Sequence, residues 1–254
     1  SVEQPSEAGP VLQEVADEVG APLQFTHDHL EFSYRFEANR ELGPHTRVCL
    51  TTSTSRFEHL AVPLPGEHQA HNCGLALGML DKLKDFGFHV PEDRVIDGLA
   101  KTRLNGRMEQ VWSEPRVLID GAHNASSLQA LIRALGAHIS YDSMVIIFGC
   151  GDDKDVDGML RQLALGADKA IFTRAKQNPR GLEPEDLMSR FNEISGKMAQ
   201  TAPSLDEALK LAARAVSRED LIVVTGSFYL VGEARKYFRD KQAKDKSAKS
   251  KAGR

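Results

Sequence analysis

The stretch Asn105–Asn124, which reads NGRMEQVWSEPRVLIDGAHN, decides the fold of the second half of this chain. Its apolar run Val117–Ile119 is typical of a short buried strand, and this run ends directly at the polar cluster Asp120–Asn124. Leucine and isoleucine then recur at spacings of three and four residues, at positions 128, 131, 132 and 135, which predicts a helix. A carboxylate, an imidazole and an amide therefore lie where a strand is followed by a helix. In open α/β sheets, ligands bind at such junctions.

The chain continues from Val117 as an alternation of strands and helices. Short apolar runs predict further strands at Met144–Phe148, Ala170–Thr173 and Leu221–Thr225, with a short one near Met198–Thr201. The segments between them predict helices, at Ala125–His138, Val156–Leu165, Glu183–Phe191, Leu205–Val216 and Phe228–Arg239. This alternation indicates an α/β fold with a mostly parallel sheet that helices cover on both faces.

The first hundred residues are organised differently. Period-two alternation and short apolar runs predict strands before residue 65, and Glu67–Phe86 predicts the longest helix of this part. Pro91–Lys101 predicts a second helix, with proline at an allowed position of the first turn. We expect a domain boundary near Thr102–Asn105, so that residues 1–104 and residues 105–240 form separate domains.

Composition limits the classes of function. The chain has 254 residues, of which 41% are hydrophobic and 27% charged, as in an ordinary globular protein. A formal net charge of -4 gives no reason to expect nucleic acid as a partner, and no apolar run approaches the ~20 residues that span a bilayer. Three separated cysteines without a CxxC pair favour the reducing cytoplasm. The tail 241–254 has six Lys or Arg and no apolar residue larger than alanine, so we expect disorder there.

Charged or polar side chains follow each long predicted strand of the second half. In chain order they include His123, Lys154, Arg174 and Ser227. Because the carboxyl ends of parallel strands meet at one edge of a sheet, these side chains are expected to converge there. Helix capping is a simpler explanation for Asn124, Asp155 and Ser227. Capping does not explain why imidazole and cationic side chains, Arg107 among them, gather at the same edge.

Several common phosphate-binding and nucleophile motifs do not occur in the sequence. The P-loop pattern G-x-x-x-x-G-K-[ST] is absent, since the only Gly–Lys pair, Gly196–Lys197, is followed by Met198. Neither GxSxG nor GxGxxG occurs. His68 and His71 lie three residues apart on a predicted helix, but no third ligand at suitable spacing supports a metal site there. A triphosphate cradle, if the chain uses one, would have to come from elsewhere.

The motifs of this chain resemble those of the folylpolyglutamate synthases, which are the folate branch of the Mur ligase superfamily. They follow the family's order: LPGEHQAHN at Leu64–Asn72, NGRME at Asn105–Glu109, DGAHN at Asp120–Asn124, a glycine and charged turn at Gly149–Asp155, Pro179–Arg180, and TGSFYLVG at Thr225–Gly232. Asn105 replaces the proline of the family's second motif. Together the motifs extend over most of the chain.

The resemblance implies an ATP-dependent, ADP-forming amide ligase with an N-terminal ATPase domain and a Rossmann-like C-terminal domain. This chain lacks the P-loop, the folate-binding loop and the Mg²⁺ ligands, which the resemblance assigns to an N-terminal part before Ser1. Residues 1–104 are then expected to be the last part of the ATPase domain, and residues 105–240 the Mur-ligase-type C-terminal domain. We expect the chain alone to be inactive, and we expect its incomplete ATPase domain to expose an apolar face.

The resemblance also implies a cytoplasmic enzyme with ATP and Mg²⁺ as cofactors and with a reduced folate and L-glutamate as substrates. The folate γ-carboxylate would become an acyl phosphate, which the amine of the incoming glutamate then attacks. Arg107 and His123 are the expected catalytic residues, and Lys154 and Ser227 are the expected contacts of the glutamate carboxylates. The partners would include the N-terminal ATPase half, and neither nucleic acid nor a membrane.

Three residues match the family's nucleotide contacts. The Asn72 amide suits an adenine edge because it both donates and accepts hydrogen bonds. The Arg107 guanidinium can hold phosphate oxygens in a fork. The Asp120 carboxylate only accepts hydrogen bonds, which suits ribose hydroxyls.

Two other interpretations remain open. Peptidoglycan-precursor ligases share the Asp-x-Ala-His element, although the run Thr225–Val231 favours the folate branch. The chain can also be a non-catalytic domain that kept a nucleotide-shaped crevice for binding or assembly. A P-loop encoded upstream of Ser1 in the parent reading frame would argue against this last interpretation.

Overall fold

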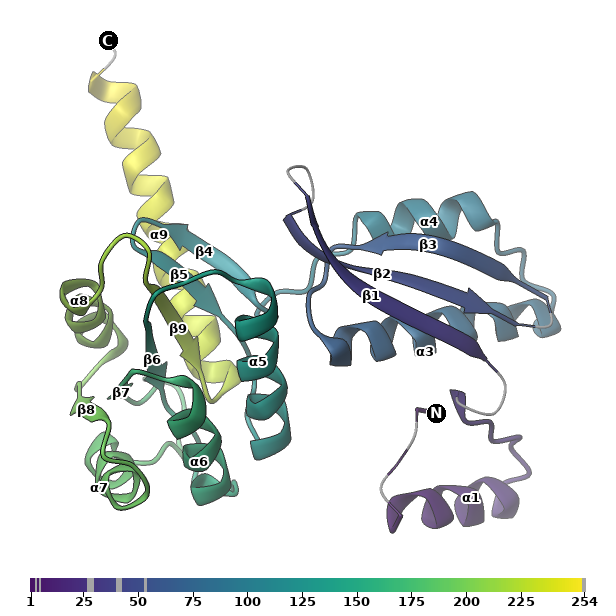
Figure 1. Ribbon diagram of the computed structural model, residues 1–254, viewed down its shortest axis with the longest axis horizontal. Coiled ribbons are helices and arrows are strands. Elements are labelled where there is room, and N and C mark those ends of the chain that lie inside the picture. The colour runs from purple at the N-terminus through teal and green to yellow at the C-terminus, as the bar shows by residue number, and fades with distance from the viewer. Residues whose placement is uncertain (3, 5, 27–29, 40–42, 53, 253–254) are drawn as a thin grey trace. The chain divides into compact units, whose positions relative to one another are not determined.

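The protein divides into two compact units, Ser1–Arg103 and Leu104–Arg254. The structure, a computed structural model, describes residues 1–2, 4, 6–26, 30–39, 43–52 and 54–252 (Figure 1). Each unit has its own sheet and its own hydrophobic core.

Unit 2 is built on a six-stranded sheet in the order β4-β5-β9-β6-β7-β8 (Figure 1). Its parallel strands are β5 (Arg116–Ile119), β6 (Met144–Phe148), β7 (Lys169–Phe172), β8 (Met198–Thr201) and β9 (Leu221–Thr225). Every residue of β6 and β9 is buried, because both faces of these central strands are covered. The predicted mostly parallel α/β sheet is therefore confirmed.

The edge strand β4 (Glu109–Ser113) pairs antiparallel with β5 and was not predicted. Only Val111 is buried in it, so the strand has no continuous apolar run. A half-exposed strand of five residues gives a weak sequence signal.

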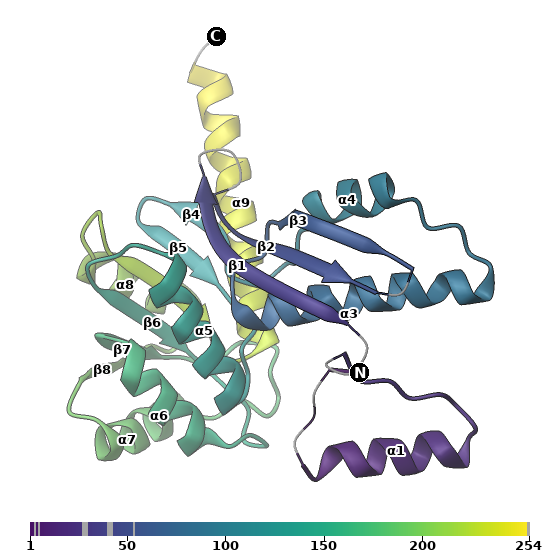
Figure 2. The same cartoon turned by 45° about the vertical axis from the view of Figure 1, so that its right-hand side comes forward.

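Helices cover the sheet of unit 2 on both faces, as the two views in Figures 1 and 2 show. One core lies under α5 (Ala125–His138), α6 (Val156–Gly166) and α7 (Pro184–Ile194). The other core lies under α8 (Leu205–Ala215) and α9 (Phe228–Ala252). Successive strand residues point to opposite faces, so Ile146 belongs to the first core and Ile147 to the second.

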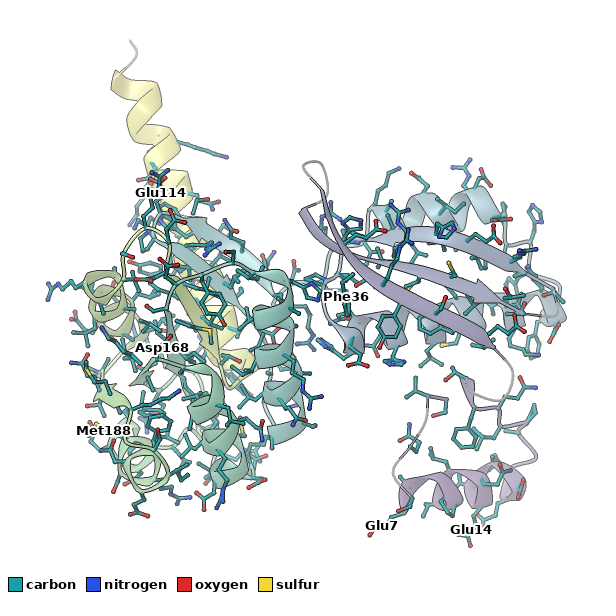
Figure 3. The ribbon with its side chains drawn as sticks, in the orientation of Figure 1. Glu7, Glu14, Phe36, Glu114, Asp168 and Met188 are labelled. Atoms are coloured by element: carbon teal, nitrogen blue, oxygen red, sulfur yellow. The ribbon has the colours of Figure 1, made fainter. Side chains whose placement is uncertain are left out.

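The strands of this sheet are also joined at their starting ends by side chains. Asp168, labelled in Figure 3, lies just before β7 and accepts a hydrogen bond from the backbone N–H of Met144 at 2.7 Å. Asp220, just before β9, accepts one from the N–H of Ser143 at 3.0 Å. These contacts fix where β6 begins relative to its two neighbours.

Helix α9 is longer than the sequence predicts. We expected a helix over Phe228–Arg239 and disorder from Lys241, but the helix continues to Ala252 (Figure 1). Lys, Ala and Gln are strong helix formers. The expectation of disorder considered only the lack of large apolar residues and left this helix propensity out. The Lys241 ammonium lies 4.5 Å from the ring centroid of Trp112, and the Gln242 side chain donates to the Val111 carbonyl at 3.1 Å. No described helix is both long and apolar enough to cross a membrane.

Unit 1 contains an antiparallel three-stranded sheet of β1 (Glu31–Asn39), β2 (Gly43–Thr51) and β3 (Arg56–Val62). The helices described for this unit are α1 (Ala8–Glu18), α3 (Glu67–Leu83), the 3₁₀ turn η1 (Lys84–Phe86) and α4 (Glu92–Ala100). Two glycines let α3 lie close to the start of β1. A Cβ at Gly74 would be 3.0 Å from the Phe32 ring, and one at Gly78 would be 3.0 Å from Leu30.

Apolar side chains are exposed on unit 1. None of the residues of α1 is buried, and Val15 and Val19 are 50% and 69% exposed. On and after α3, Met79 is 62% and Phe86 is 79% exposed. Met79 and Phe86 line the same hollow, and clustered exposed apolar side chains promote association.

We predict that Met79→Ser combined with Phe86→Ser lowers both dye binding and self-association of the chain. Each change removes exposed apolar area, so the fluorescence of a hydrophobicity-sensitive dye and the average mass in sedimentation should fall. Arg94→Ser with Lys101→Ser is the control, because it alters two exposed polar residues of the same unit. A parent chain that is strictly monomeric and binds no dye would contradict the prediction.

Candidate functional site

The carboxyl ends of the parallel strands of unit 2 form one continuous polar edge. Backbone hydrogen bonds join the loops directly: Asp120 N–H donates to the Val224 carbonyl at 3.0 Å, and Gly226 N–H donates to the Ala122 carbonyl at 3.0 Å. Glycine permits this close approach. A Cβ at Gly149 would be 2.2 Å from the Thr173 carbonyl oxygen, which no larger residue allows. The edge thus brings together the loops that carry the predicted site residues of this unit.

Asp120 fixes the segment that carries Arg107. One oxygen of its carboxylate accepts the Met108 N–H, and the other accepts the Ala122 N–H, each at 2.9 Å. The Gly121 N–H in turn donates to the Gly106 carbonyl at 2.8 Å. Asp120 is 6% exposed, so its carboxylate is largely engaged by the protein itself. The sequence predicted a ribose contact for this residue and did not reveal its structural role.

A second network holds the same segment from helix α9. The Gly106 N–H donates to Glu109 at 2.7 Å, and Glu109 accepts from Arg235 Nε at 3.0 Å. Arg235 also donates to the Asn105 side chain at 2.8 Å. A Cβ at Gly106, where φ is +66°, would be 2.9 Å from Val231. Arg235 was missed by the sequence analysis, although it lies one helical turn after Val231 and so shares its face.

Arg107 and His123 both contact the ring of Phe228. The Arg107 guanidinium carbon lies 4.8 Å from the ring centroid, and the centroids of the His123 and Phe228 rings are 5.3 Å apart. His123 Nδ1 is 2.9 Å from the Gly121 carbonyl oxygen. Because a carbonyl only accepts, this contact requires the proton on Nδ1, and in the neutral ring Nε2 is then an acceptor. Phe228 lies in the TGSFYLVG motif, but the sequence analysis did not predict a role for its side chain.

The turn after β6 carries a cluster of opposite charges. The Lys154 ammonium lies 2.8 Å from Asp153, and the Arg180 guanidinium lies 3.8 Å from the same carboxylate. The hydrogen bond from Lys154 holds the pKa of Asp153 below its usual range. Arg174, predicted to join this edge, forms an ion pair with Glu183. The structure therefore adds Arg180 to Lys154 as a cation at this site.

The three predicted helix caps are confirmed. Asn124 accepts the Ser127 N–H at 2.8 Å, Asp155 accepts the Gly158 N–H at 3.0 Å, and Ser227 accepts the Leu230 N–H at 3.2 Å. The capping contact of Ser227 uses its oxygen as an acceptor. Its hydroxyl proton is left for another partner.

Asn72, the third predicted nucleotide contact, is an exposed residue in the second turn of α3 in unit 1. The structure describes its position within that unit only. Its grouping with Arg107 and Asp120 therefore stays a prediction.

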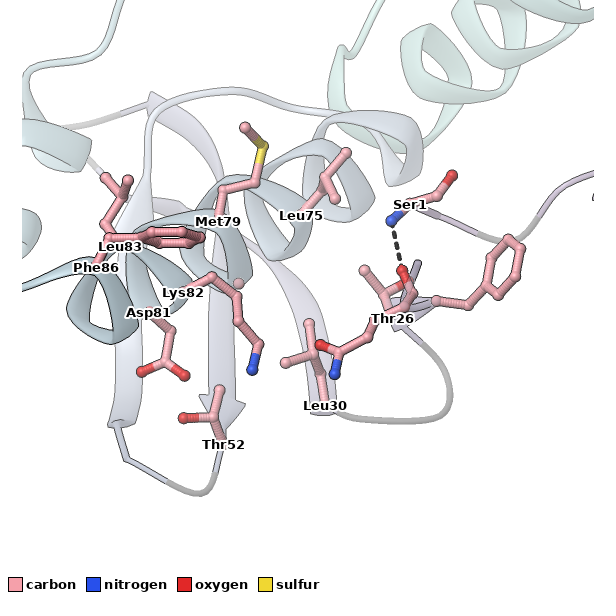
Figure 4. Close-up of a pocket in the computed structure, with 13 residues that line it drawn as sticks. Ser1, Thr26, Leu30, Thr52, Leu75, Met79, Asp81, Lys82, Leu83 and Phe86 are labelled. Atoms are coloured by element: carbon pink, nitrogen blue, oxygen red, sulfur yellow. Dashed lines mark hydrogen bonds between the residues drawn. The ribbon is translucent and has the colours of Figure 1, made fainter. Parts of the chain in front are cut away.

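A cavity of about 520 Å³ opens in unit 1, but it is lined by none of the predicted site residues (Figure 4). Most of its apolar lining comes from α3 and η1, and Phe25 and Leu30 complete it. The residues of α3 and η1 are Leu75, Met79, Leu83 and Phe86. The Asp81 carboxylate at its rim accepts a hydrogen bond from Thr54 at 2.6 Å. The cavity is thus part of the exposed apolar surface of this unit and lacks converging reactive groups.

No metal-binding cluster is apparent in the part of the chain that the structure describes. Groups of three or more His, Cys, Asp or Glu side chains placed to hold an ion do not occur there.

The fold and site of unit 2 define a Mur-ligase-type domain. Residues 106–228 match the family described as "Mur ligase, glutamate ligase domain", which spans the sheet from β4 to the first residue of α9. The match includes Arg107, the DGAHN cluster, the Lys154 turn and Ser227.

Known relatives identify the branch of this superfamily. The dihydrofolate synthase/folylpolyglutamate synthase of Mycobacterium tuberculosis is 34% identical over 203 residues, which are 73% of this chain and 42% of that protein. The enzyme of the same name from Bacillus subtilis is 28% identical over 237 residues, covering 93% of this chain and 53% of its own. The solved structure of M. tuberculosis folylpolyglutamate synthase with ADP and AMPPCP is similar with a TM-score of 0.84 and 29% identity, over 93% of this chain and 54% of that one.

The chain belongs to the Mur ligase superfamily, and within it to the folylpolyglutamate synthases. It spans about half the length of the relatives that it matches.

We predict that Asp120→Asn lowers the free energy of unfolding of unit 2 by about 1–3 kcal/mol, because an amide nitrogen cannot accept one of the two backbone N–H groups. Urea unfolding followed by the fluorescence of Trp112, the single tryptophan of the chain, measures the change. Asp152→Asn, at an exposed position of the same edge, should change the stability by less than about 0.5 kcal/mol. Equal stability of Asp120→Asn and the parent would show that the two contacts do not hold the segment.

Proposed function

We propose that this chain is the C-terminal part of an ATP-dependent, ADP-forming ligase that adds L-glutamate to the γ-carboxylate of a reduced folate. The observation that carries the proposal is the placement of Arg107 beside Asp120 and His123, at the edge of a sheet that belongs to the glutamate ligase domain family. The M. tuberculosis relative was solved with ADP and AMPPCP, which supports a nucleotide as the ligand of this edge.

The proposed reaction has two steps. An oxygen of the folate γ-carboxylate attacks the γ-phosphorus of ATP, the bond to the bridging oxygen breaks, and ADP leaves. The amine of L-glutamate then attacks the carbonyl carbon of the acyl phosphate, inorganic phosphate leaves with the C–O bonding pair, and the nitrogen loses a proton. Both steps move negative charge between oxygens, so fixed positive charge lowers their barriers.

Arg107 supplies that charge in our proposal. Its guanidinium can hold two oxygens of the transferred phosphate in a fork. Asp120 and the Glu109–Arg235 pair keep the backbone on both sides of Arg107 in place. Such fixed placement means that the charge needs little reorganisation when the phosphate moves.

The remaining nucleotide roles are assigned by hydrogen-bonding capacity. We assign a ribose hydroxyl to the Asp120 carboxylate, because a carboxylate only accepts hydrogen bonds and a hydroxyl can donate one. His123, with Nδ1 held by the Gly121 carbonyl, offers Nε2 to orient the nucleotide or a substrate. We assign the adenine edge to the amide of Asn72.

The incoming glutamate is assigned to the edge near Lys154. Glutamate has two carboxylates, and both Lys154 and Arg180 approach the single carboxylate of Asp153. Lys154 has three N–H donors and Arg180 has five, so each keeps donors for a ligand carboxylate beside its contact with Asp153. The hydroxyl proton of Ser227 is a further donor for a carboxylate.

We predict that ligase activity requires the sequence upstream of this chain, and that within the extended form Arg107→Ala lowers kcat roughly 10²- to 10³-fold. Both forms are given Mg²⁺-ATP, a reduced folate and L-glutamate, and ADP and the lengthened folate are measured. Arg107→Lys should recover only part of the rate because an ammonium lacks the fork. Arg133→Ala, an exposed arginine of α5, is the matched control. If the extended form makes no lengthened folate, the proposed function is wrong.

We predict that Lys154→Ala raises the KM for L-glutamate roughly tenfold or more and leaves the KM for ATP nearly unchanged, because one charge-assisted hydrogen bond to a carboxylate is lost. Steady-state kinetics of the extended form, with each substrate varied in turn, separates the two constants. Lys236→Ala, at an exposed position of α9, serves as the control. A change confined to the KM for ATP would place Lys154 at the nucleotide instead.

A further inference from the structure

We propose that Phe228 is a positioning residue, whose ring holds the guanidinium of Arg107 and the imidazole of His123 in place for the transfer of phosphate. The inference rests on the proposed function, and it adds to it a residue that takes no part in the chemistry.

The backbone of Phe228 is fixed at the end of a short turn. The preceding Ser227 caps α9 through the Leu230 N–H, and Gly226 donates its N–H to the Ala122 carbonyl at 3.0 Å. Gly226 has a φ of +106°, and a Cβ there would be 2.7 Å from the Gly149 carbonyl oxygen. The turn therefore presents Phe228 at a set place beside the DGAHN segment.

The Phe228 ring contacts both predicted catalytic side chains. The Arg107 guanidinium carbon lies 4.8 Å from the ring centroid, within the ~6 Å over which an aromatic face attracts a cation. The His123 ring centroid lies 5.3 Å away, within the roughly 4.5–7 Å range of aromatic pairs. One apolar side chain thus contacts the two residues whose relative placement matters most for the proposed reaction.

Gly121 gives independent support for this arrangement. A Cβ at position 121 would lie 2.4 Å from Phe228 Cε1 and 2.5 Å from Arg107 Nη1. The space that any larger residue would need is therefore filled by these two side chains together. This close packing explains why the DGAHN motif has glycine at position 121. The backbone of Gly121 is engaged as well, because its carbonyl contacts His123 and its N–H donates to the Gly106 carbonyl.

An aromatic ring suits this task better than a carboxylate. The face of a ring attracts the flat side of a guanidinium, whereas hydrogen bonds to phosphate form in the guanidinium plane. Phe228 can therefore restrict the rotation of Arg107 without using its N–H donors and without neutralising its charge. Restricting a long side chain before the ligand arrives reduces the conformational entropy lost on binding.

The first test uses nuclear magnetic resonance of the isotope-labelled chain. The Arg107 Nε–H proton and the His123 ring protons should show ring-current shifts, which Phe228→Ala and Phe228→Leu abolish and Phe228→Tyr keeps. Gly121→Ala should displace the same signals because its methyl group occupies the space of both side chains. Tyr229→Ala is the control, since Tyr229 is the next residue and is similarly exposed, at 54% against 49%. Unchanged Arg107 signals in Phe228→Ala would overturn the proposal.

The second test uses the extended, active form. Phe228→Ala and Phe228→Leu should lower kcat/KM for ATP roughly 2- to 30-fold, the factor that corresponds to a cation–π contact, and Phe228→Tyr should restore it. Phe228→Leu distinguishes the filling of space from the attraction by an aromatic face, because leucine fills space but has no aromatic face. Full activity of Phe228→Leu would overturn the positioning role. Absence of ligase activity in the unaltered extended form would instead overturn the proposed function, and the proton shifts would still decide whether Phe228 holds the two side chains.

Discussion

The candidate site depends on one buried carboxylate that joins two parts of the chain. Asp120 accepts the N–H of Met108, twelve residues earlier, and the N–H of Ala122, two residues later. Because the carboxylate is almost fully buried, loss of either contact would leave a polar group without a partner. The chain around Arg107 is thereby fixed to the end of β5, and every role that we assign to Arg107 presupposes this attachment.

Much of unit 2 could be predicted because its central strands are covered on both faces and so appear in the sequence as unbroken apolar runs. Strand β4 lies at the edge and buries only Val111, so no such run marks it. The end of α9 was missed for a related reason, since helix propensity alone, without an apolar stripe, gives little signal. Where burial is one-sided or absent, the sequence pattern carries less information.

The site residues also differ in how far the sequence could predict them. Arg107 and His123 belong to motifs, so the sequence could single them out, and the convergence of strand ends placed them at one edge. The supports of these residues are Phe228, which lies in the TGSFYLVG motif, and Arg235, which lies in an ordinary helical segment. Their roles depend on contacts across more than a hundred residues of sequence, which no motif reveals. Such contacts follow from the sheet order, which places β5 beside β9.

Phe228 and Arg235, which hold the segment around Arg107, both lie on helix α9. Phe228 and Arg235 are seven residues apart, which is two turns or about 10 Å along one face of a helix. One contacts the side chain of Arg107, and the other holds the backbone just before it through Glu109 and Asn105. Residues 105–107 directly follow the boundary at Arg103–Leu104, and these contacts attach them firmly to the rest of unit 2. Chimeras that exchange halves between relatives should accordingly be joined before Leu104 and should inherit α9 and the arginine segment from the same parent.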